Sequence, residues 1–494
     1  MSENLLSKFA KAVASTSVGV FCQIVLSLLG FMIAVRFISE KDFGVFILIQ
    51  VTASFFGIII SLALENISVT KLIASNEDDL KMAISNTAIC YKFITTIIMS
   101  VVILLCNPLI FYIFKSYQLS QSVIYIALFF LLSSFDDLFQ RILQGFHQYK
   151  KMAIAQIING STRILFIVTF LIIFKMNLKG LIYAFLFSFL FSNIYQFWVI
   201  PSKKQFNLDR TLFKEIFKFG FPLGLNNILT FIFTKIDRVM IGAMISPIEV
   251  AYYEISSKIP DNSRRMYQSF QSVFFPNMSE LFSKNKHEQA ETVLNNSIRF
   301  VSLATMFMAL ISILFQKDII LLLFSEKYIE CAPAFALLMV SLGIGLVGNI
   351  MGTSLVALGQ SDKPVKINIV DTITNVIGNS IMIPMFGFMG AVYAALFSRC
   401  ATNPFNFYFL KKGGVNIKAS QYLKPIIIFL ICGTLFNFLR FDTLFLKILL
   451  IAFFLILCWA LSVIKAKDFS NLFQILHPPP QESFKENDQE DFIE

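Results

Sequence analysis

Charged residues are scarce in this sequence, and their scarcity excludes most soluble folds. Asp, Glu, Lys and Arg make up 15% of the 494 residues, whereas hydrophobic residues make up 56%. Because a soluble domain usually has about a quarter charged residues, most side chains here must face something other than water. No polar stretch between the apolar segments is long enough to separate soluble domains. The composition therefore predicts an integral membrane protein.

Histidine is nearly absent and cysteine is unpaired, which excludes the usual metal and disulfide frameworks. The chain has three histidines, all outside the apolar runs, and none of its seven cysteines forms a CxxC pair. We therefore expect no metal site and no cofactor, and we interpret the cysteines as small packing residues. The net charge of +10 comes from basic residues in short loops. Because they form no basic-aromatic module, we expect no nucleic acid as a partner.

Fourteen apolar segments are long enough to cross a membrane as helices, which takes roughly 20 residues each. An even number of crossings places both ends of the chain on one side. The segments lie near 16–38, 43–64, 88–110, 122–143, 154–174, 178–200, 219–245, 251–275, 297–316, 333–358, 367–386, 389–410, 423–439 and 444–464.

The loops between these segments predict the orientation. One set of alternate loops holds twenty-one basic residues and the other set holds eight. Because cytoplasmic loops carry the excess of Lys and Arg, we expect both termini in the cytoplasm. The first apolar run is too long for a signal-peptide core and has no A-x-A cleavage site, so we expect it to be retained.

An internal repeat predicts two similar lobes. The stretch Gly180–Ser188 matches Gly390–Ser398 at six of nine positions, and each stretch begins the sixth segment of its half. Such halves are related by a pseudo-twofold axis along the membrane normal and enclose a central cavity. The expected organisation is a first six-helix lobe at 1–200, a basic connector at 201–218, a second six-helix lobe at 219–411, a C-terminal helix pair at 412–464 and an acidic, disordered cytoplasmic tail at 465–494.

Several ionisable residues fall inside the predicted spans, where each costs about 2.5–3.5 kcal/mol on insertion scales. Opposite charges four residues apart can neutralise one another along a helix, and such pairs explain about half of them. These pairs are Asp137–Arg141, Glu254–Lys258 and Asp261–Arg265.

The remaining basic residues predict a cavity for an anionic substrate. No acidic residue lies within four positions of Arg163 or Arg399, and the eighth segment has three basic residues against two acidic ones. Since a guanidinium is disfavoured in lipid, we expect these groups to face the cavity, where the planar fork of arginine suits phosphate. The candidate diphosphate ligands are Arg163, Lys258, Arg264, Arg265 and Arg399.

Carboxylates inside spans are candidates for ion coupling, because they can exchange a proton or a sodium ion. The alternative for Asp237 is that it balances Arg238 or Lys235, which would require a neighbouring helix because adjacent residues point to different faces. The candidates are Asp136, Asp137, Asp237 and Asp371.

A series of short motifs carries a family resemblance. The motifs are Lys235–Gly242 with Val250–Tyr253, Phe275–Ser279, Leu358–Ser361, Asn375–Pro384 and Gly387–Ala395. In this order they resemble the bacterial polysaccharide-precursor flippases for O-antigen (the lipopolysaccharide glycan), capsule and exopolysaccharide. These belong to the multidrug/oligosaccharidyl-lipid/polysaccharide exporter superfamily. The resemblance covers residues 1 to about 464.

The resemblance implies a function. Such a protein moves an undecaprenyl-diphosphate-linked oligosaccharide from the cytoplasmic to the periplasmic leaflet of the bacterial inner membrane by alternating access, coupled to an ion as in an antiporter. Its partners would be the lipid-linked glycan, membrane lipid, a polysaccharide polymerase and a chain-length regulator.

Three alternatives stay open. A peptidoglycan-precursor flippase shares the chemistry, and a drug extruder of the same superfamily would instead predict an acidic excess in the cavity. A membrane polysaccharide polymerase or ligase would need a sizeable extracytoplasmic loop, whereas the longest loop has about twenty residues and is predicted to be cytoplasmic. We therefore expect no enzymatic activity and no catalytic residues.

Overall fold

The described part of the chain is helical. The computed structural model describes residues 22–61, 66–201, 209–439 and 443–464, and no strand occurs among them. Each of the fourteen expected segments overlaps a helix of this part. The expected acidic tail, 465–494, and residues 202–208 of the expected connector lie outside the described residues.

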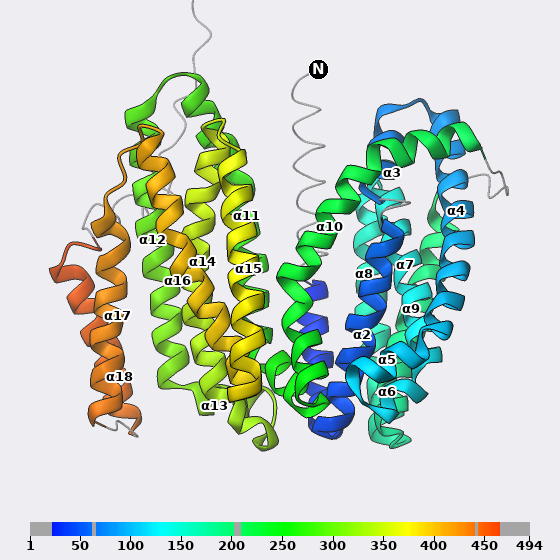
Figure 1. Ribbon diagram of the computed structural model, residues 1–494, viewed down its shortest axis with the longest axis horizontal. Helices are drawn as coiled ribbons and strands as arrows, with labels where there is room; N and C mark the ends of the chain where they lie inside the picture. Colours follow the sequence, from blue (N-terminus) through cyan, green and yellow to red (C-terminus); the bar gives the residue numbers. More distant parts are fainter. Residues whose placement is uncertain (1–21, 62–65, 202–208, 440–442, 465–494) are drawn as a thin grey trace, which may run out of the picture.

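A first bundle is formed by the helices that precede residue 200, and it lies on the right in Figure 1. It begins with an unlabelled helix, Cys22–Phe37, which packs against α8. Its other elements are α2 (Glu40–Ser61), α3 (Asn66–Ser75), α4 (Asp78–Leu105), α5 (Asn107–Phe114), α6 (Tyr117–Gln121), α7 (Val123–Gly145), α8 (Tyr149–Ile167), the π-helix η1 (Val168–Ile173) and α9 (Asn177–Val199).

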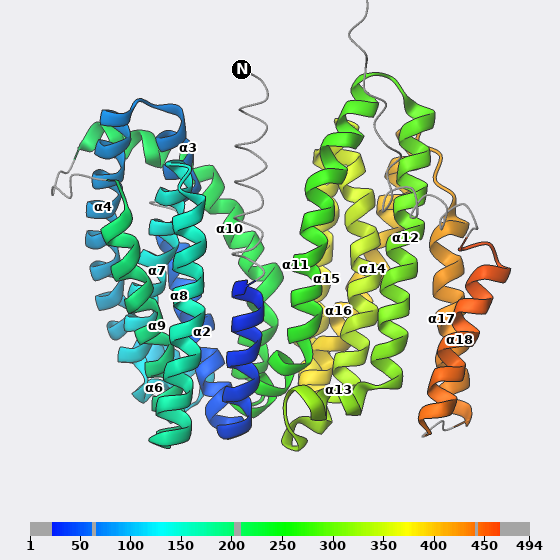
Figure 2. The same ribbon diagram turned by 180° about the vertical axis from the view of Figure 1, so that it is seen from behind.

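A second bundle is formed by the later helices, with α10 passing between the two (Figure 1). The outer pair α17 and α18 lies beside α12, and Phe454 of α18 approaches Phe307 of α12 with ring centroids 5.9 Å apart (Figure 2). The elements are α10 (Arg210–Met244), α11 (Pro247–Ser283), α12 (His287–Leu314), α13 (Gln316–Leu323), the 3₁₀ helix η2 (Glu326–Cys331), α14 (Ala332–Ala357), α15 (Asp362–Phe386), α16 (Phe388–Lys412), α17 (Ala419–Leu439) and α18 (Leu444–Ala460).

Many of these helices are suited to a membrane. Nine of the described helices combine the length and hydropathy of a span, and Cys22–Phe37 and α18 are shorter apolar helices. Their outward sides keep large apolar residues exposed, such as Leu105 and Trp459, which a bilayer accommodates and water does not. The protein is thus an all-α, multi-pass membrane protein, as expected. The number of fourteen crossings stays a prediction, because α10, α11 and α16 fall outside those limits.

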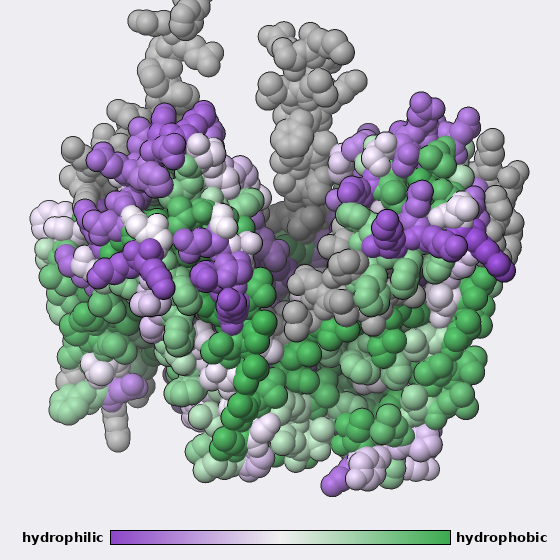
Figure 3. All heavy atoms as spheres, turned by 45° about the horizontal axis from the view of Figure 1, so that its top comes forward, coloured by the Kyte–Doolittle hydropathy of each residue, from purple (hydrophilic) through white to green (hydrophobic). Residues whose placement is uncertain are grey.

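The two bundles diverge toward one end of the molecule and approach each other at the other end (Figures 1 and 2). We call the wide end, which carries α3 and the turn between α11 and α12, the basic face. Figure 3 shows hydrophilic side chains gathered over this face, above a belt of hydrophobic ones. The narrow end carries α5, α6 and α13, and we call it the opposite face.

Direct contacts join the bundles at the opposite face. Arg36 donates to the carbonyl oxygens of Leu322 at 2.6 Å and Phe324 at 3.0 Å. In return, Lys327 donates to the carbonyl oxygen of Ile38 at 2.8 Å. These bonds satisfy carbonyl groups at the ends of Cys22–Phe37 and α13, where a helix has no partners of its own.

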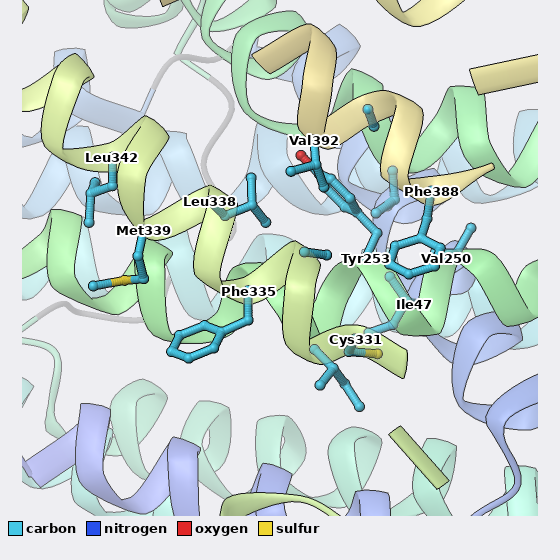
Figure 4. Packing of buried hydrophobic residues seen from close by; sticks show 14 of the residues in the cluster. Ile47, Val250, Tyr253, Cys331, Phe335, Leu338, Met339, Leu342, Phe388 and Val392 are labelled. Carbon is cyan, nitrogen blue, oxygen red and sulfur yellow. The ribbon is translucent and has the colours of Figure 1, made fainter. Parts of the chain in front are cut away.

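The approach of α2 to α11 depends on a glycine. A Cβ atom added at Gly44 would lie 1.7 Å from the carbonyl oxygen of Pro247, so no larger residue fits this backbone arrangement. Beside it, Figure 4 shows Ile47 of α2 near Val250 of α11 and Phe388 of α16, all buried in one hydrophobic cluster. The opposite face is therefore closed by both polar bonds and apolar packing.

The basic connector expected at 201–218 is helical from Arg210 onward, so it is in part the beginning of α10. Asp209 caps this helix, because its side chain accepts from the backbone N–H groups of Thr211 at 2.8 Å and Leu212 at 3.2 Å. Leu212 and Ile216 are buried in a cluster with residues of α3, α4 and α7. This packing holds the beginning of α10 against the first bundle. Helical periodicity within this charged stretch was the signal that could have predicted a helix here.

Candidate functional site

A cavity of about 250 Å³ lies among α10, α11, α14, α15 and α16, and we call it the cationic cavity. Three of the five predicted phosphate ligands line it, namely Arg264, Arg265 and Arg399. Lys235 and Arg238 join them from α10. The acidic residues that line the cavity are Asp237, Asp261 and Asp371, so basic side chains are in excess.

Arg238 is held by fixed partners. Its guanidinium donates to Glu254 at 2.6 Å, to Ser257 at 2.8 Å and to Asp261 at 3.1 Å. It also donates to the carbonyl oxygen of Thr234 at 3.2 Å and is only 3% exposed. With its charge balanced by two carboxylates of α11, Arg238 joins two helices and has little capacity left for a substrate.

Lys235, Arg264 and Arg265 are placed differently. All three line the cationic cavity, yet among the described residues none of them forms an ion pair within 4.0 Å. In particular, Arg265 does not pair with Asp261 as its spacing suggested, because Asp261 faces Arg238. These three cations are therefore available to an anion that enters the cavity.

Asp237 faces neutral donors. It accepts hydrogen bonds from the Tyr253 hydroxyl at 2.6 Å and from the Asn379 amide at 2.7 Å, and it is 8% exposed. The alternative in which Asp237 balances Arg238 is wrong for this structure, since Arg238 pairs with Glu254 and Asp261. Asp237 and Arg238 do find their partners on neighbouring helices, as expected, but the sequence did not indicate which residues these partners are.

Asp371 lies between two adjoining cavities. It lines the cationic cavity and also a second cavity of about 230 Å³ among α11, α14, α15 and α16. Thr402 of α16 donates to its carboxylate at 3.3 Å. Arg399 lines both cavities as well. The two compartments therefore adjoin one another at an acidic and a basic side chain.

Asp136 and Arg163 lie inside the first bundle, away from the cationic cavity. Asp136 accepts from Ser192 at 2.8 Å, from Gln196 at 2.7 Å and from Gln140 at 2.8 Å. Arg163 donates to the Asn159 side chain and stacks over the Phe185 ring, with its guanidinium carbon 4.3 Å from the ring centroid. The structure thus does not bring these two candidates together with Arg264 and Arg265.

The other two candidates also lie apart. Asp137 lines a cavity of about 370 Å³ on the inner side of the first bundle, and Arg141 lies 3.8 Å from its carboxylate, as its spacing predicted. Lys258 pairs with Glu254 at 3.7 Å and lies 4.0 Å above the Phe31 ring of the first bundle. Lys235 lines both this first-bundle cavity and the cationic cavity, so the two compartments adjoin.

Lys235 falls in a predicted span but was not among the expected ligands. The available signal was its position in the motif Lys235–Gly242, three residues before Arg238 on nearly the same helix face. The described residues contain no group of three or more His, Cys, Asp or Glu side chains suited to hold a metal ion.

Known proteins resemble this chain in parts of their sequence. The chain is 27% identical over 201 residues to the probable low-salt glycan biosynthesis flippase Agl15 of Haloferax volcanii, which covers 40% of this chain and 42% of the relative. It is 22% identical over 210 residues to the capsular polysaccharide biosynthesis protein CapF of Staphylococcus aureus, which covers 42% and 53%. The matched region thus spans about half the length of these relatives.

Solved structures share the fold over nearly the whole chain. A structure of the lipid II flippase MurJ in an inward closed conformation matches with a TM-score of 0.71 and 14% identity, covering 93% of this chain and 99% of that one. An inward-facing multidrug resistance MATE family transporter of the MOP superfamily matches with a TM-score of 0.65 and 15% identity, covering 81% and 97%. These likenesses establish the fold.

The family is established by a longer sequence match. The family described as polysaccharide biosynthesis protein matches residues 33–333, which is more than half of the chain. This match confirms the family resemblance, and it contains the motifs Lys235–Gly242, Val250–Tyr253 and Phe275–Ser279. The chain belongs to the family of polysaccharide biosynthesis proteins.

Proposed function

We propose that this protein is a flippase that moves a polyprenyl-diphosphate-linked oligosaccharide from the cytoplasmic to the periplasmic leaflet of the inner membrane. The family, the names of the matched relatives and the fold shared with a lipid II flippase support a transporter of lipid-linked glycans. The observation that carries the proposal is the set of cations in the cavity beside α10. Lys235, Arg264 and Arg265 line it without ion pairs among the described residues.

The diphosphate group binds at these cations. Arginine and lysine have only donors to offer, and a diphosphate has only acceptors at neutral pH, so the chemistry is complementary. Arg264 and Arg265 are neighbours on α11, and Arg399 reaches the same cavity from α16. The charge of the ligand offsets the cost of keeping these cations within the membrane span. A cationic drug would require an acidic excess, whereas basic side chains outnumber acidic ones among the described lining residues of this cavity.

Transport proceeds by alternating access between the bundles. With both termini and the basic face in the cytoplasm, the bundles of this structure diverge toward the cytoplasmic leaflet (Figure 1). Opening toward the periplasm then requires the loss of the bonds that Arg36 and Lys327 make across the opposite face. Opening also separates the apolar contact of α2 with α11 at Gly44, so a substrate shifts the equilibrium only if it binds the other state more tightly.

Ion coupling is assigned to Asp371. Its carboxylate has one described side-chain donor, Thr402, whereas Asp237 has two and Asp136 has three. A carboxylate with few fixed donors can release one cation and accept another at a small cost in hydrogen bonds. Asp371 also lies beside the diphosphate site, so occupation of the two sites is electrostatically coupled.

The test is the double exchange Arg264→Ala/Arg265→Ala in purified protein. Binding of undecaprenyl diphosphate should fall at least tenfold, because charge-assisted hydrogen bonds are worth about 1.5–3 kcal/mol each. Export of the surface glycan in cells should stop while the protein stays in the membrane. The matched control is Lys284→Ala/Lys286→Ala, which removes the same charge from the basic face outside the cavity. Unchanged binding in the first variant would overturn the proposal.

A peptidoglycan-precursor flippase is the second candidate, and the fold shared with the lipid II flippase favours it. Both substrates carry a polyprenyl diphosphate, so the cationic cavity suits either one. Complementation separates them: the chain should restore surface polysaccharide in a strain without its own exporter, and it should fail to replace a missing lipid II flippase.

A further inference from the structure

The second cavity, which adjoins the cationic one, is lined by amides, hydroxyls and bare backbone. It has a volume of about 230 Å³, and we call it the amide cavity. Its only described charged lining residues are Asp371 and Arg399, both at the border with the cationic cavity. Together the two compartments exceed the ~300 Å³ at which small-molecule sites begin. The uncharged polar side chains of the amide cavity are Gln271, Asn349, Thr353, Asn368, Thr402, Asn403 and Asn406.

Three glycines on one face of α14 shape this cavity. A Cβ atom at Gly345 would lie 2.2 Å from the Arg399 guanidinium, and one at Gly348 would lie 2.0 Å from the Asn403 carbonyl. The third, Gly352, has the Asn406 carbonyl at 3.6 Å from such an atom. The three glycines thus face three polar residues of α16 one by one, and a side chain at Gly348 would occupy the space that Asn403 needs.

The first bundle shows the same register between its corresponding helices. Asn193 of α9 donates to the carbonyl oxygen of Leu132 at 2.8 Å, and Asn403 of α16 donates to that of Ile344 at 2.7 Å. These two asparagines are related by the offset of the internal repeat that joins Gly180–Ser188 to Gly390–Ser398. The pair α7 and α9 of the first bundle and the pair α14 and α16 of the second bundle are therefore aligned through one shared type of hydrogen bond.

The two bundles differ one helical turn further along that register. Four residues after Leu132 comes Asp136, which accepts from Ser192 and Gln196 of α9 and fills the space between the helices. Four residues after Ile344 comes Gly348, which has no side chain and leaves its place to Asn403. At this position the amide cavity therefore has no carboxylate that could bind the amides of α16 as Asp136 binds those of α9.

One buried amide of α16 has no described partner in this cavity. Asn406 is 6% exposed and lines the amide cavity, yet its side chain has no hydrogen bond to any described residue. The corresponding residue of the first bundle, Gln196, donates to Asp136 at 2.7 Å. The Asn406 amide therefore has both its donor and its acceptor capacity available to a ligand in the amide cavity.

We propose that the amide cavity is the glycan subsite and binds the first neutral sugar after the diphosphate. This inference rests on the proposed function, because the phosphate in the cationic cavity places the sugar at its border. An amide offers both donors and an acceptor, which suits the hydroxyl groups of a sugar, since each of these is also donor and acceptor. An apolar ligand would gain no hydrogen bond from Asn406, Asn403 and Thr402, and an anion would use their donors but not their acceptors.

The test compares two probes, undecaprenyl diphosphate and undecaprenyl-diphosphate-linked N-acetylglucosamine, for binding to the purified full chain. The variant Asn406→Ala should weaken binding of the sugar-bearing probe about five- to tenfold, the loss of one or two hydrogen bonds. It should change binding of the sugar-free probe less than twofold. Because Asn406 has no described hydrogen bond, the exchange should leave folding intact.

A second variant fills the cavity. Gly352→Leu has space at its Cβ position, where the nearest atom would be 3.6 Å away, and its side chain would occupy the subsite. Gly352→Leu should weaken binding of the sugar-bearing probe more than Asn406→Ala does. The matched control is Gly433→Leu on α17, where no atom lies within 4 Å of an added Cβ among the described residues.

The outcomes separate the two proposals. If wild-type protein binds both probes equally, or if Asn406→Ala weakens both alike, the glycan subsite is wrong and the diphosphate site stands. If wild-type protein binds neither probe, the proposed function is wrong and the subsite falls with it. Selective loss of the sugar-bearing probe in both variants, with the control unchanged, supports the subsite.

Discussion

Arg238 of α10 donates to Glu254 of α11 across 2.6 Å, and both side chains are shielded, with 4% and 12% of their surfaces exposed. The pair joins α10, which passes between the bundles, to α11 of the second bundle. Asp261, further along the same α11, holds the other arm of the guanidinium at 3.1 Å. The most buried charge beside the cationic cavity is thus a structural one, which distinguishes Arg238 from Arg264 and Arg265.

We predict that Arg238→Ala destabilises the protein more than Arg264→Ala does. Removal of one partner from a buried pair leaves an uncompensated charge and costs about 3–5 kcal/mol. Thermal unfolding in detergent, followed by loss of the monodisperse peak, measures the difference. The double exchange Arg238→Met/Glu254→Leu should recover part of the loss, since it leaves no buried charge of the pair. Equal stability of Arg238→Ala and Arg264→Ala would contradict a structural role.

Asp136 gives a second prediction, because three neutral side chains donate to it inside the first bundle. Asp136→Ala should lower stability by about 1–3 kcal/mol for each donor left without a partner. Asp136→Asn keeps an acceptor in place, so it should fold and transport like the wild type. Transport lost in Asp136→Asn, at normal thermal stability, would instead support ion coupling at this residue.

The bonds across the opposite face predict a conformational effect. Arg36→Ala/Lys327→Ala removes hydrogen bonds to Leu322, Phe324 and Ile38 and should favour the state that is open at this face. Spin labels at two exposed positions, Phe37 and Leu322, should show a longer distance in the variant.

The control for that experiment is Lys317→Ala, which removes a charge from α13 that has no described bond to the first bundle. Its label distances should match those of the wild type. A distance distribution in Arg36→Ala/Lys327→Ala that equals the control would show that apolar packing around Gly44 is sufficient to keep the face closed.

A further prediction concerns ion coupling at Asp371. In proteoliposomes, Asp371→Asn should transport lipid-linked glycan without a response to an imposed proton or sodium gradient, because an amide exchanges neither ion. Binding of undecaprenyl diphosphate should stay within about threefold of the wild type, since Arg264 and Arg265 are retained. If transport by Asp371→Asn still accelerates when the gradient is applied, Asp371 is not the coupling residue, and Asp237 becomes the candidate for ion coupling.

The membrane class, the two repeated bundles and the family were predictable from the sequence alone. Apolar runs of about 20 residues have one physical solution in lipid, a helix with all its backbone bonds satisfied internally. The offset between Gly180–Ser188 and Gly390–Ser398 also predicted which helices correspond, and the bonds of Asn193 and Asn403 now show the same register. Spacing along one helix correctly predicted the pairs Asp137–Arg141 and Glu254–Lys258.

Partners on different helices were not predictable in this way. Arg163 and Arg399 looked alike in the sequence, since neither has an acid within four positions, yet Arg163 lies inside the first bundle and Arg399 lines a cavity. Asp261 was expected to pair with Arg265 and pairs with Arg238. The sequence determined that charges would be buried in a membrane bundle, because periodicity and hydropathy are local properties. Only the tertiary structure decided which charges neutralise one another and which remain for a substrate, because that choice depends on distances between helices far apart in the chain.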